Sequence, residues 1–89
     1  MKLKTLLNEV TVYGKFEIDN RVYTIKNLER EAKKVEGVKV SRYPSALQNH
    51  TTIVVTAPSL SAADKVLKAW KEEGLQWPQR KDFGKKLRY

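Results

Sequence analysis

The residue types that most often carry catalysis are scarce in this chain of 89 residues. His50 is its single histidine, it lies in the stretch Gln48-Asn49-His50-Thr51, and the chain has no Gly-x-Ser-x-Gly motif. Acidic residues such as Glu17 and Asp19 have no histidine or further carboxylate at the spacing of a metal site. The 4 glycines are isolated, so no glycine-rich phosphate loop is present. We therefore expect a protein that is not an enzyme and that holds no cofactor and no metal.

Positive charge is the clearest compositional signal. The chain has 18 Lys and Arg against 10 Asp and Glu, a formal net charge of +8. Such a balance favours nucleic acid, an acidic protein surface or anionic lipid as partner. No apolar run reaches the roughly 18 to 20 residues that span a bilayer. Because the amino terminus also lacks the apolar centre of a secretory signal, and cysteine is absent, we expect a cytoplasmic protein without membrane contact or disulfides.

The most strand-like stretch covers residues 51–57, where six of seven residues are β-branched. Ile53 and Val55 point to one side of such a strand, and Thr52, Val54 and Thr56 to the other. This alternation predicts a central strand with one face on the core and the other face toward water.

The remaining elements are expected around this strand. Residues 21–25 also fit one helical face, but their composition favours a hairpin strand after an Asp19-Asn20 turn. The second helix has a capping box by spacing at Ser61 and Asp64, and Gly74 closes it so that Trp70 and Leu75 can touch. In chain order we expect strands over 10–18 and 21–25, a helix over 27–36, strands over 38–43 and 51–57, a helix over 60–74 and a short edge strand over 75–77.

From residue 21 to residue 77 this order, βαββαβ, resembles the ferredoxin-like superfold. The resemblance implies an α+β protein, with an antiparallel sheet of four to five strands and two helices on one face, plus an extra N-terminal strand over 10–18. We expect one domain over 1–78 and a basic C-terminal tail over 79–89. The RNA-recognition motif shares the superfold, but its aromatic consensus is missing, because the matching strand carries Thr52, Val54 and Thr56.

Candidate binding residues lie on the sheet face that the helices should leave uncovered and in the tail. Phosphates are bound by cations, and bases of single strands stack on exposed aromatic rings. The interleaving of both types predicts a nucleic-acid-binding surface, DNA or RNA, whose log affinity would fall with log salt at about −3.6 for four phosphates of a duplex. The candidates are Tyr13, Lys15, Lys39 and Tyr43 on the sheet, and Arg80, Lys81, Phe83, Lys85, Lys86 and Arg88 in the tail.

An alternative function is protein binding. Small basic α+β chains without catalytic groups, including virus-encoded ones, suit inhibitors or adaptors that dock on an acidic partner surface. An exposed edge strand, over either 10–18 or 38–43, could pair with a partner strand or with a second copy to form a homodimer. Binding of nucleic acid and binding of a protein are thus both expected classes of function.

Overall fold

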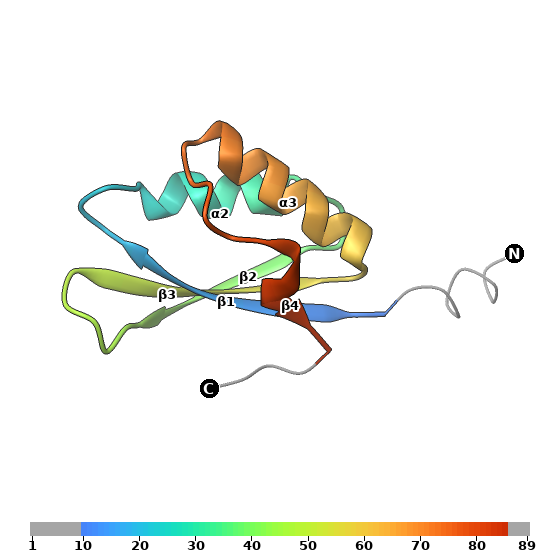
Figure 1. The fold of residues 1–89 in the computed structure, drawn as a ribbon, viewed down its shortest axis with the longest axis horizontal. Helices are drawn as coiled ribbons and strands as arrows, with labels where there is room; N and C mark the ends of the chain where they lie inside the picture. Colours follow the sequence, from blue (N-terminus) through green and yellow to red (C-terminus); the bar gives the residue numbers. More distant parts are fainter. Residues whose placement is uncertain (1–9, 86–89) are drawn as a thin grey trace, which may run out of the picture.

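The computed structural model describes residues 10–85 as a sheet of four strands with two helices on one of its faces (Figure 1). The strands run antiparallel in the order β2-β3-β1-β4. The predicted α+β class, with a four-stranded antiparallel sheet and two helices on one face, is confirmed. The elements are β1 (Val12–Asp19), α2 (Ile25–Lys33), β2 (Lys39–Pro44), β3 (His50–Ala57), α3 (Leu60–Glu72), the 3-10 turn η1 (Arg80–Asp82) and β4 (Phe83–Gly84).

The sheet has a core face because buried residues alternate along β1 and lie opposite buried residues of β3. Phe16 lies opposite Ile53 and Gly14 opposite Val55, and the side chains of Phe16, Ile53 and Val55 belong to the core beneath the helices. Phe16, Ile53 and Val55 are at most 1% exposed. Strand β3 pairs on both sides, with β1 and with β2, so its central position is confirmed. Thr52 and Val54 on its other face are buried, so the expectation that this face meets water is wrong for them.

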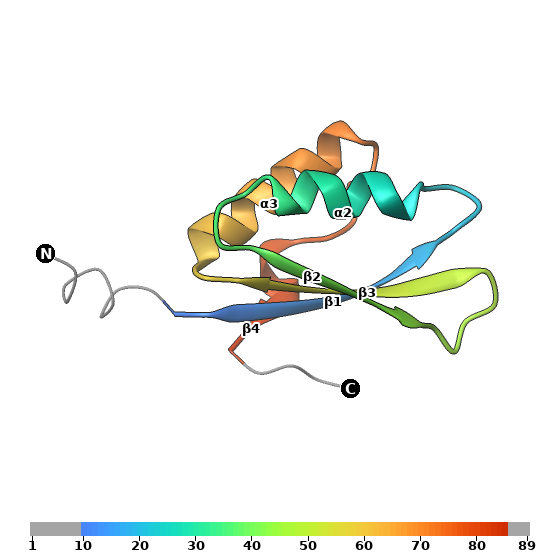
Figure 2. The same cartoon turned by 180° about the vertical axis from the view of Figure 1, so that it is seen from behind.

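The two helices close the core from one side, and α2 lies on the β2 side of the layer (Figure 2). Trp70 of α3 is fully buried and meets the ring of Phe16 edge-on, with centroids 5.2 Å apart. Its Nε1–H donates to the carbonyl oxygen of Leu28 in α2 at 2.9 Å, so one side chain links both helices to the sheet. None of the helices among residues 10–85 is long and apolar enough to cross a membrane.

The expected hairpin strand over 21–25 is wrong. Asp19 accepts the backbone N–H of Arg21 at 2.8 Å through its carboxylate, and its carbonyl accepts from Val22 and Tyr23. These bonds form a turn that leads into α2, which begins at Ile25. On the β4 side of β1, only Tyr13 and Gly14 are paired, so the hydrogen bonds of Asp19, and not an occupied edge, direct this segment away from a hairpin. The part of the chain described here thus holds no extra strand before the β-α-β-β-α-β run.

The predicted edge strand over 75–77 is also wrong. Leu75 is fully buried at the end of α3, where its N–H donates to the carbonyl of Trp70 at 2.9 Å and Gly74 has a φ of +95°. This is the predicted closing contact of the helix. The helix start differs from expectation, because Ser59, and not Ser61, accepts a backbone N–H, that of Ala62 at 3.2 Å. The last strand is instead β4, which pairs with Tyr13 and Gly14.

Candidate functional site

On the sheet side away from the helices, side chains of β2, β3 and β1 form rows across the sheet. Lys39, Thr56 and Tyr13 form a row in which Gly84 of β4 is the next neighbour. The row beside it has Ser41, Val54 and Lys15, and the third has Tyr43, Thr52 and Glu17. We call these nine residues, Tyr13, Lys15, Glu17, Lys39, Ser41, Tyr43, Thr52, Val54 and Thr56, the open face.

The predicted sheet candidates therefore come together on one surface. Tyr13 and Tyr43 lie two strands and four residues apart, a separation of about 16 Å for strands at 4.8 Å and a rise of 3.3 Å per residue. Lys15 lies in the row between the two tyrosines. Rings at this separation would contact bases that are not adjacent along a strand.

Exposure differs between the rim and the centre of the open face. Tyr43 is 48% exposed and Lys15 and Lys39 are exposed, whereas Tyr13 is half-buried. Thr52 and Val54, in the middle strand, are buried. The surface thus has a dry centre flanked by cations and rings, and both tyrosines keep part of their surface accessible.

Glu17 gives the open face a negative charge at one end. Its Oε1 accepts hydrogen bonds from the hydroxyls of Thr52 at 2.8 Å and Ser45 at 2.5 Å. Burial acts to raise the pKa of Glu17, but these hydrogen bonds and the charge of Lys15 outweigh it, so the pKa lies below its ordinary value of 4.5. The carboxylate is therefore ionised at neutral pH and disfavours phosphate near Tyr43.

The first part of the predicted tail lies against the domain. The Arg80 Nε is 3.5 Å from a carboxylate oxygen of Asp64, which belongs to α3 and hence to the helix side. Lys81 is exposed in η1, where Gln79 and Asp82 form a reciprocal capping box. Lys85 is exposed and follows Gly84, the partner of Tyr13. Lys86 and Arg88 lie outside the described residues.

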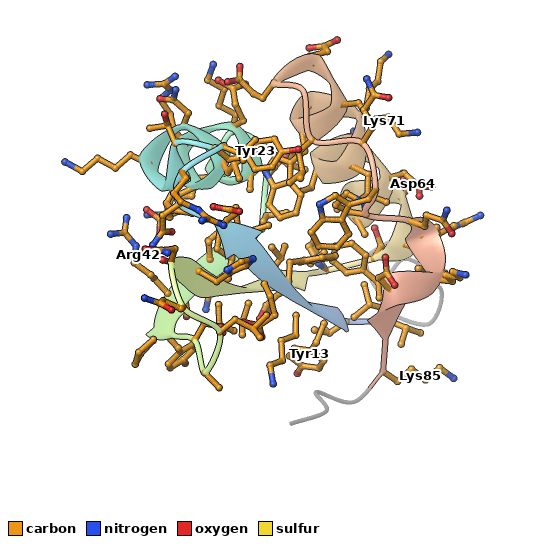
Figure 3. The ribbon with its side chains drawn as sticks, turned by 60° about the vertical axis from the view of Figure 1, so that its left-hand side comes forward. Tyr13, Tyr23, Arg42, Asp64, Lys71 and Lys85 are labelled. Carbon is orange, nitrogen blue, oxygen red and sulfur yellow. The ribbon has the colours of Figure 1, made fainter. Side chains whose placement is uncertain are left out.

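Phe83 lies in the core, and not on an exposed tail as expected. Its ring is 6% exposed and packs against Phe16, with centroids 5.5 Å apart, so it belongs to the core and offers no platform for a base. Figure 3 shows Tyr13 on the side of the sheet opposite Lys71 and Asp64, with Lys85 on the same side as Tyr13. Of the tail candidates that are described, Lys85 is thus the one that continues the open face.

The expected edge over 10–18 is interrupted, because β4 pairs with Tyr13 and Gly14 of β1, whereas β2 is the edge on the other side of the sheet. His50 is half-buried, and its Nδ1 lies 2.9 Å from the carbonyl oxygen of Gln48. Within residues 10–85, no three His, Asp or Glu side chains gather in a way that could hold a metal ion.

Two features escaped the sequence-based list of sites. Glu17 shares the open face with Tyr13 and Lys15, a placement that the period of two already contained. A row of exposed cations on α2, formed by Lys26, Arg30, Lys33 and Lys34, has a helical spacing that could have been read as one face.

No protein-family model matches the sequence, and comparisons with curated proteins and with solved structures return no match.

Proposed function

We propose that this protein binds single-stranded nucleic acid through the open face. One observation carries the proposal: register places Tyr13, Lys15, Lys39 and Tyr43 on the sheet face that neither α2 nor α3 covers. Rings supply sequence-tolerant stacking for bases, and lysines supply contacts to phosphate. A flat sheet offers no deep groove, which favours a splayed single strand over a duplex.

Charge supports the same proposal. The whole chain carries +8, and Lys85 continues the open face at Tyr13. A nucleic-acid strand that crossed the open face from Tyr43 to Tyr13 would run from the negative charge of Glu17 toward the lysines near Tyr13. The path of the phosphates is then expected on the Lys15, Lys39 and Lys85 side.

We also infer that the fold is ferredoxin-like. The β-α-β-β-α-β order of the elements and the antiparallel strand order β2-β3-β1-β4 support this assignment. The first strand of this order is Val12–Asp19, and not residues 21–25 as expected. This superfold hosts unrelated functions, so the proposed function depends on the open face and not on the fold.

The test is a titration of labelled oligothymidine, single-stranded and as a duplex with oligoadenosine, followed by fluorescence anisotropy at several salt concentrations. The single strand should bind more tightly, with a slope of log affinity against log salt of about −2.8 if four phosphates are contacted. Equal or tighter binding of the duplex, or binding that ignores salt, would contradict the proposal.

Variants locate the surface. Tyr43→Ala should weaken single-strand binding about tenfold, because one stacked base is lost. Tyr43→Phe keeps the ring and should bind as the parent does, and Lys68→Ala on α3 is the matched cation control. If Lys68→Ala weakens binding as much as Lys39→Ala does, the contacts lie elsewhere.

A further inference from the structure

Strand β2 leaves one side of its backbone without a strand partner. It pairs with β3 on its other side, so about half of its N–H and C=O groups point away from the described sheet. Five of its six residues are exposed, and Val40 is half-buried. At the opposite edge, β4 has only two residues. The β2 edge, which lies beside α2, is thus a surface on which an extended chain could pair.

The cation row of α2, Lys26, Arg30, Lys33 and Lys34, belongs to the same side of the molecule. Arg42 of β2 donates to both carboxylate oxygens of Glu29 in α2, at 3.0 and 2.6 Å, which ties the helix to the edge strand. Figure 2 shows α2 on this side of the helix layer, and Figure 3 shows Arg42 between the helix and the strand.

The acidic side chains of α2, Glu29 and Glu31, already form ion pairs. Glu29 is held by Arg42, and Glu31 lies 3.0 Å from Lys34 and 3.7 Å from Arg30. Among residues 10–85, Lys26, Lys33 and Lys39 make no ion pair. Cations thus outnumber acids beside the β2 edge, although Lys26 and Lys33 also act on Glu29 and lower its pKa.

The helix dipole favours Arg30, Lys33 and Lys34 at the C-terminal end of α2, but it does not explain Lys26. Lys26 lies in the first turn of α2, where the helix dipole favours an acid, and that turn contains none. The lysine therefore opposes the dipole of its own helix. A binding role would account for the position of Lys26.

We infer that β2 and the α2 cation row form a docking site for an acidic, extended segment of another protein, which would add to the sheet beside β2. Backbone groups of the strand edge select a polypeptide, because a nucleic acid has no matching row of amides and carbonyls. The cations select acidic side chains. This site uses the backbone edge of β2 and the α2 cations and borders the open face along β2, but it does not depend on the proposed function.

The alternation of β2 sets the side-chain pattern of the partner. Val40 and Arg42 face the helix layer, and Lys39, Ser41 and Tyr43 face the other way. An added strand repeats this alternation. Its acids should point toward α2, and the residues between them, apolar and β-branched, should lie beside Tyr43.

A second copy of this chain is the less suitable occupant. Antiparallel pairing of two β2 strands keeps both helix layers on one side of the joined sheet and brings the two α2 cation rows near each other. Like charges at such an interface oppose association.

The experiment titrates a labelled peptide of alternating glutamate and valine and follows its anisotropy. Lys26→Glu with Lys33→Glu should weaken binding about tenfold, since two cations are reversed. Lys65→Glu with Lys68→Glu on α3 makes the same change in net charge and should bind as the parent does. Equal loss in both double variants, or no binding of the peptide to the parent, would overturn the inference.

Two further peptides test the strand pairing without altering the protein. One carries N-methyl groups on its glutamates and the other on its valines, so each blocks one edge of the added strand. One of the two should bind as the unmodified peptide does and the other should fail. Equal binding or equal failure of both, displacement by oligothymidine, or self-association of the protein at the titrated concentrations would each overturn the inference.

Discussion

At the scale of single residues, the negative charge of Glu17 acts against the binding of phosphate to the open face. Its carboxylate stands in the same row as Tyr43, and hydroxyls of Ser45 and Thr52 hold it there. Because the pKa of Glu17 is lowered, the charge persists at neutral pH and repels phosphate.

Glu17→Gln should therefore strengthen binding of oligothymidine, by about threefold for the removal of one exposed like charge. The measurement is the same anisotropy titration, with Glu72→Gln on α3 as the control that changes net charge equally. A decrease in affinity for Glu17→Gln would show that the carboxylate accepts hydrogen bonds from bases instead.

Gly14 is the residue on which the pairing of β4 depends most directly. A Cβ at this position would lie 2.7 Å from Cε2 of Phe16 and 2.9 Å from Cε1 of Phe83. Both rings are packed in the core and have little room to shift.

Gly14→Ala should lower the free energy of unfolding by about 2 kcal/mol, the usual cost of overpacking a core. Urea denaturation measures it. Gly74→Ala is the comparison, since nothing lies within 4 Å of its Cβ and only the φ of +95° is strained, at about 1 kcal/mol. A Gly14→Ala variant as stable as the parent would show that the rings are loosely packed.

At the scale of elements, the sequence predicted the helices and strands that are determined by local sequence patterns. The alternation over 51–57 identified β3, and the Gly74 cap identified the end of α3. The division of the sheet into a core face and an uncovered face followed from a period of two, so Tyr13, Lys15, Lys39 and Tyr43 could be grouped before the structure.

The failures concern information that is not local. Residues 21–25 have strand composition, yet the hydrogen bonds around Asp19 direct them into a turn and the start of α2. Phe83 looks like part of a polar tail, but Gly14 leaves space for its ring at the end of the sheet. A pairing that spans seventy residues cannot be read from either segment alone.

The pairing of β4 gives a prediction at this scale. Phe83→Ala should lower the free energy of unfolding by about 3 kcal/mol and expose the β4 amides, because the ring anchors the strand on Phe16. Urea denaturation and hydrogen exchange at Gly84 measure the two effects. Trp77→Ala removes a half-exposed ring near Phe16 and should cost less; an equal cost would place the anchor elsewhere.

For the whole molecule, acid should lower stability. Hydrogen bonds from Arg21 bring the pKa of Asp19 from 3.8 to about 2, and Arg42 and Lys34 lower the pKa values of Glu29 and Glu31. A carboxyl whose folded pKa is depressed stabilises the fold above its unfolded pKa and loses this effect as pH falls through the folded value.

The melting temperature should thus be level from neutral pH down to about pH 5 and then fall toward about pH 2. Circular dichroism at a series of pH values measures it. Asp19→Asn should flatten the last part of this decline, and Glu72→Gln should leave it unchanged. A melting temperature that rises on acidification would contradict the assigned hydrogen bonds.

We propose that single-stranded nucleic acid binds the open face and not the face of the sheet that the helices cover. Amide chemical-shift mapping by NMR during titration with oligothymidine tests this most directly. We predict the largest shifts at Tyr13, Lys15, Lys39, Ser41 and Tyr43, with α3 unchanged. Shifts that concentrate on α2 and α3 while the open face stays silent would contradict the account.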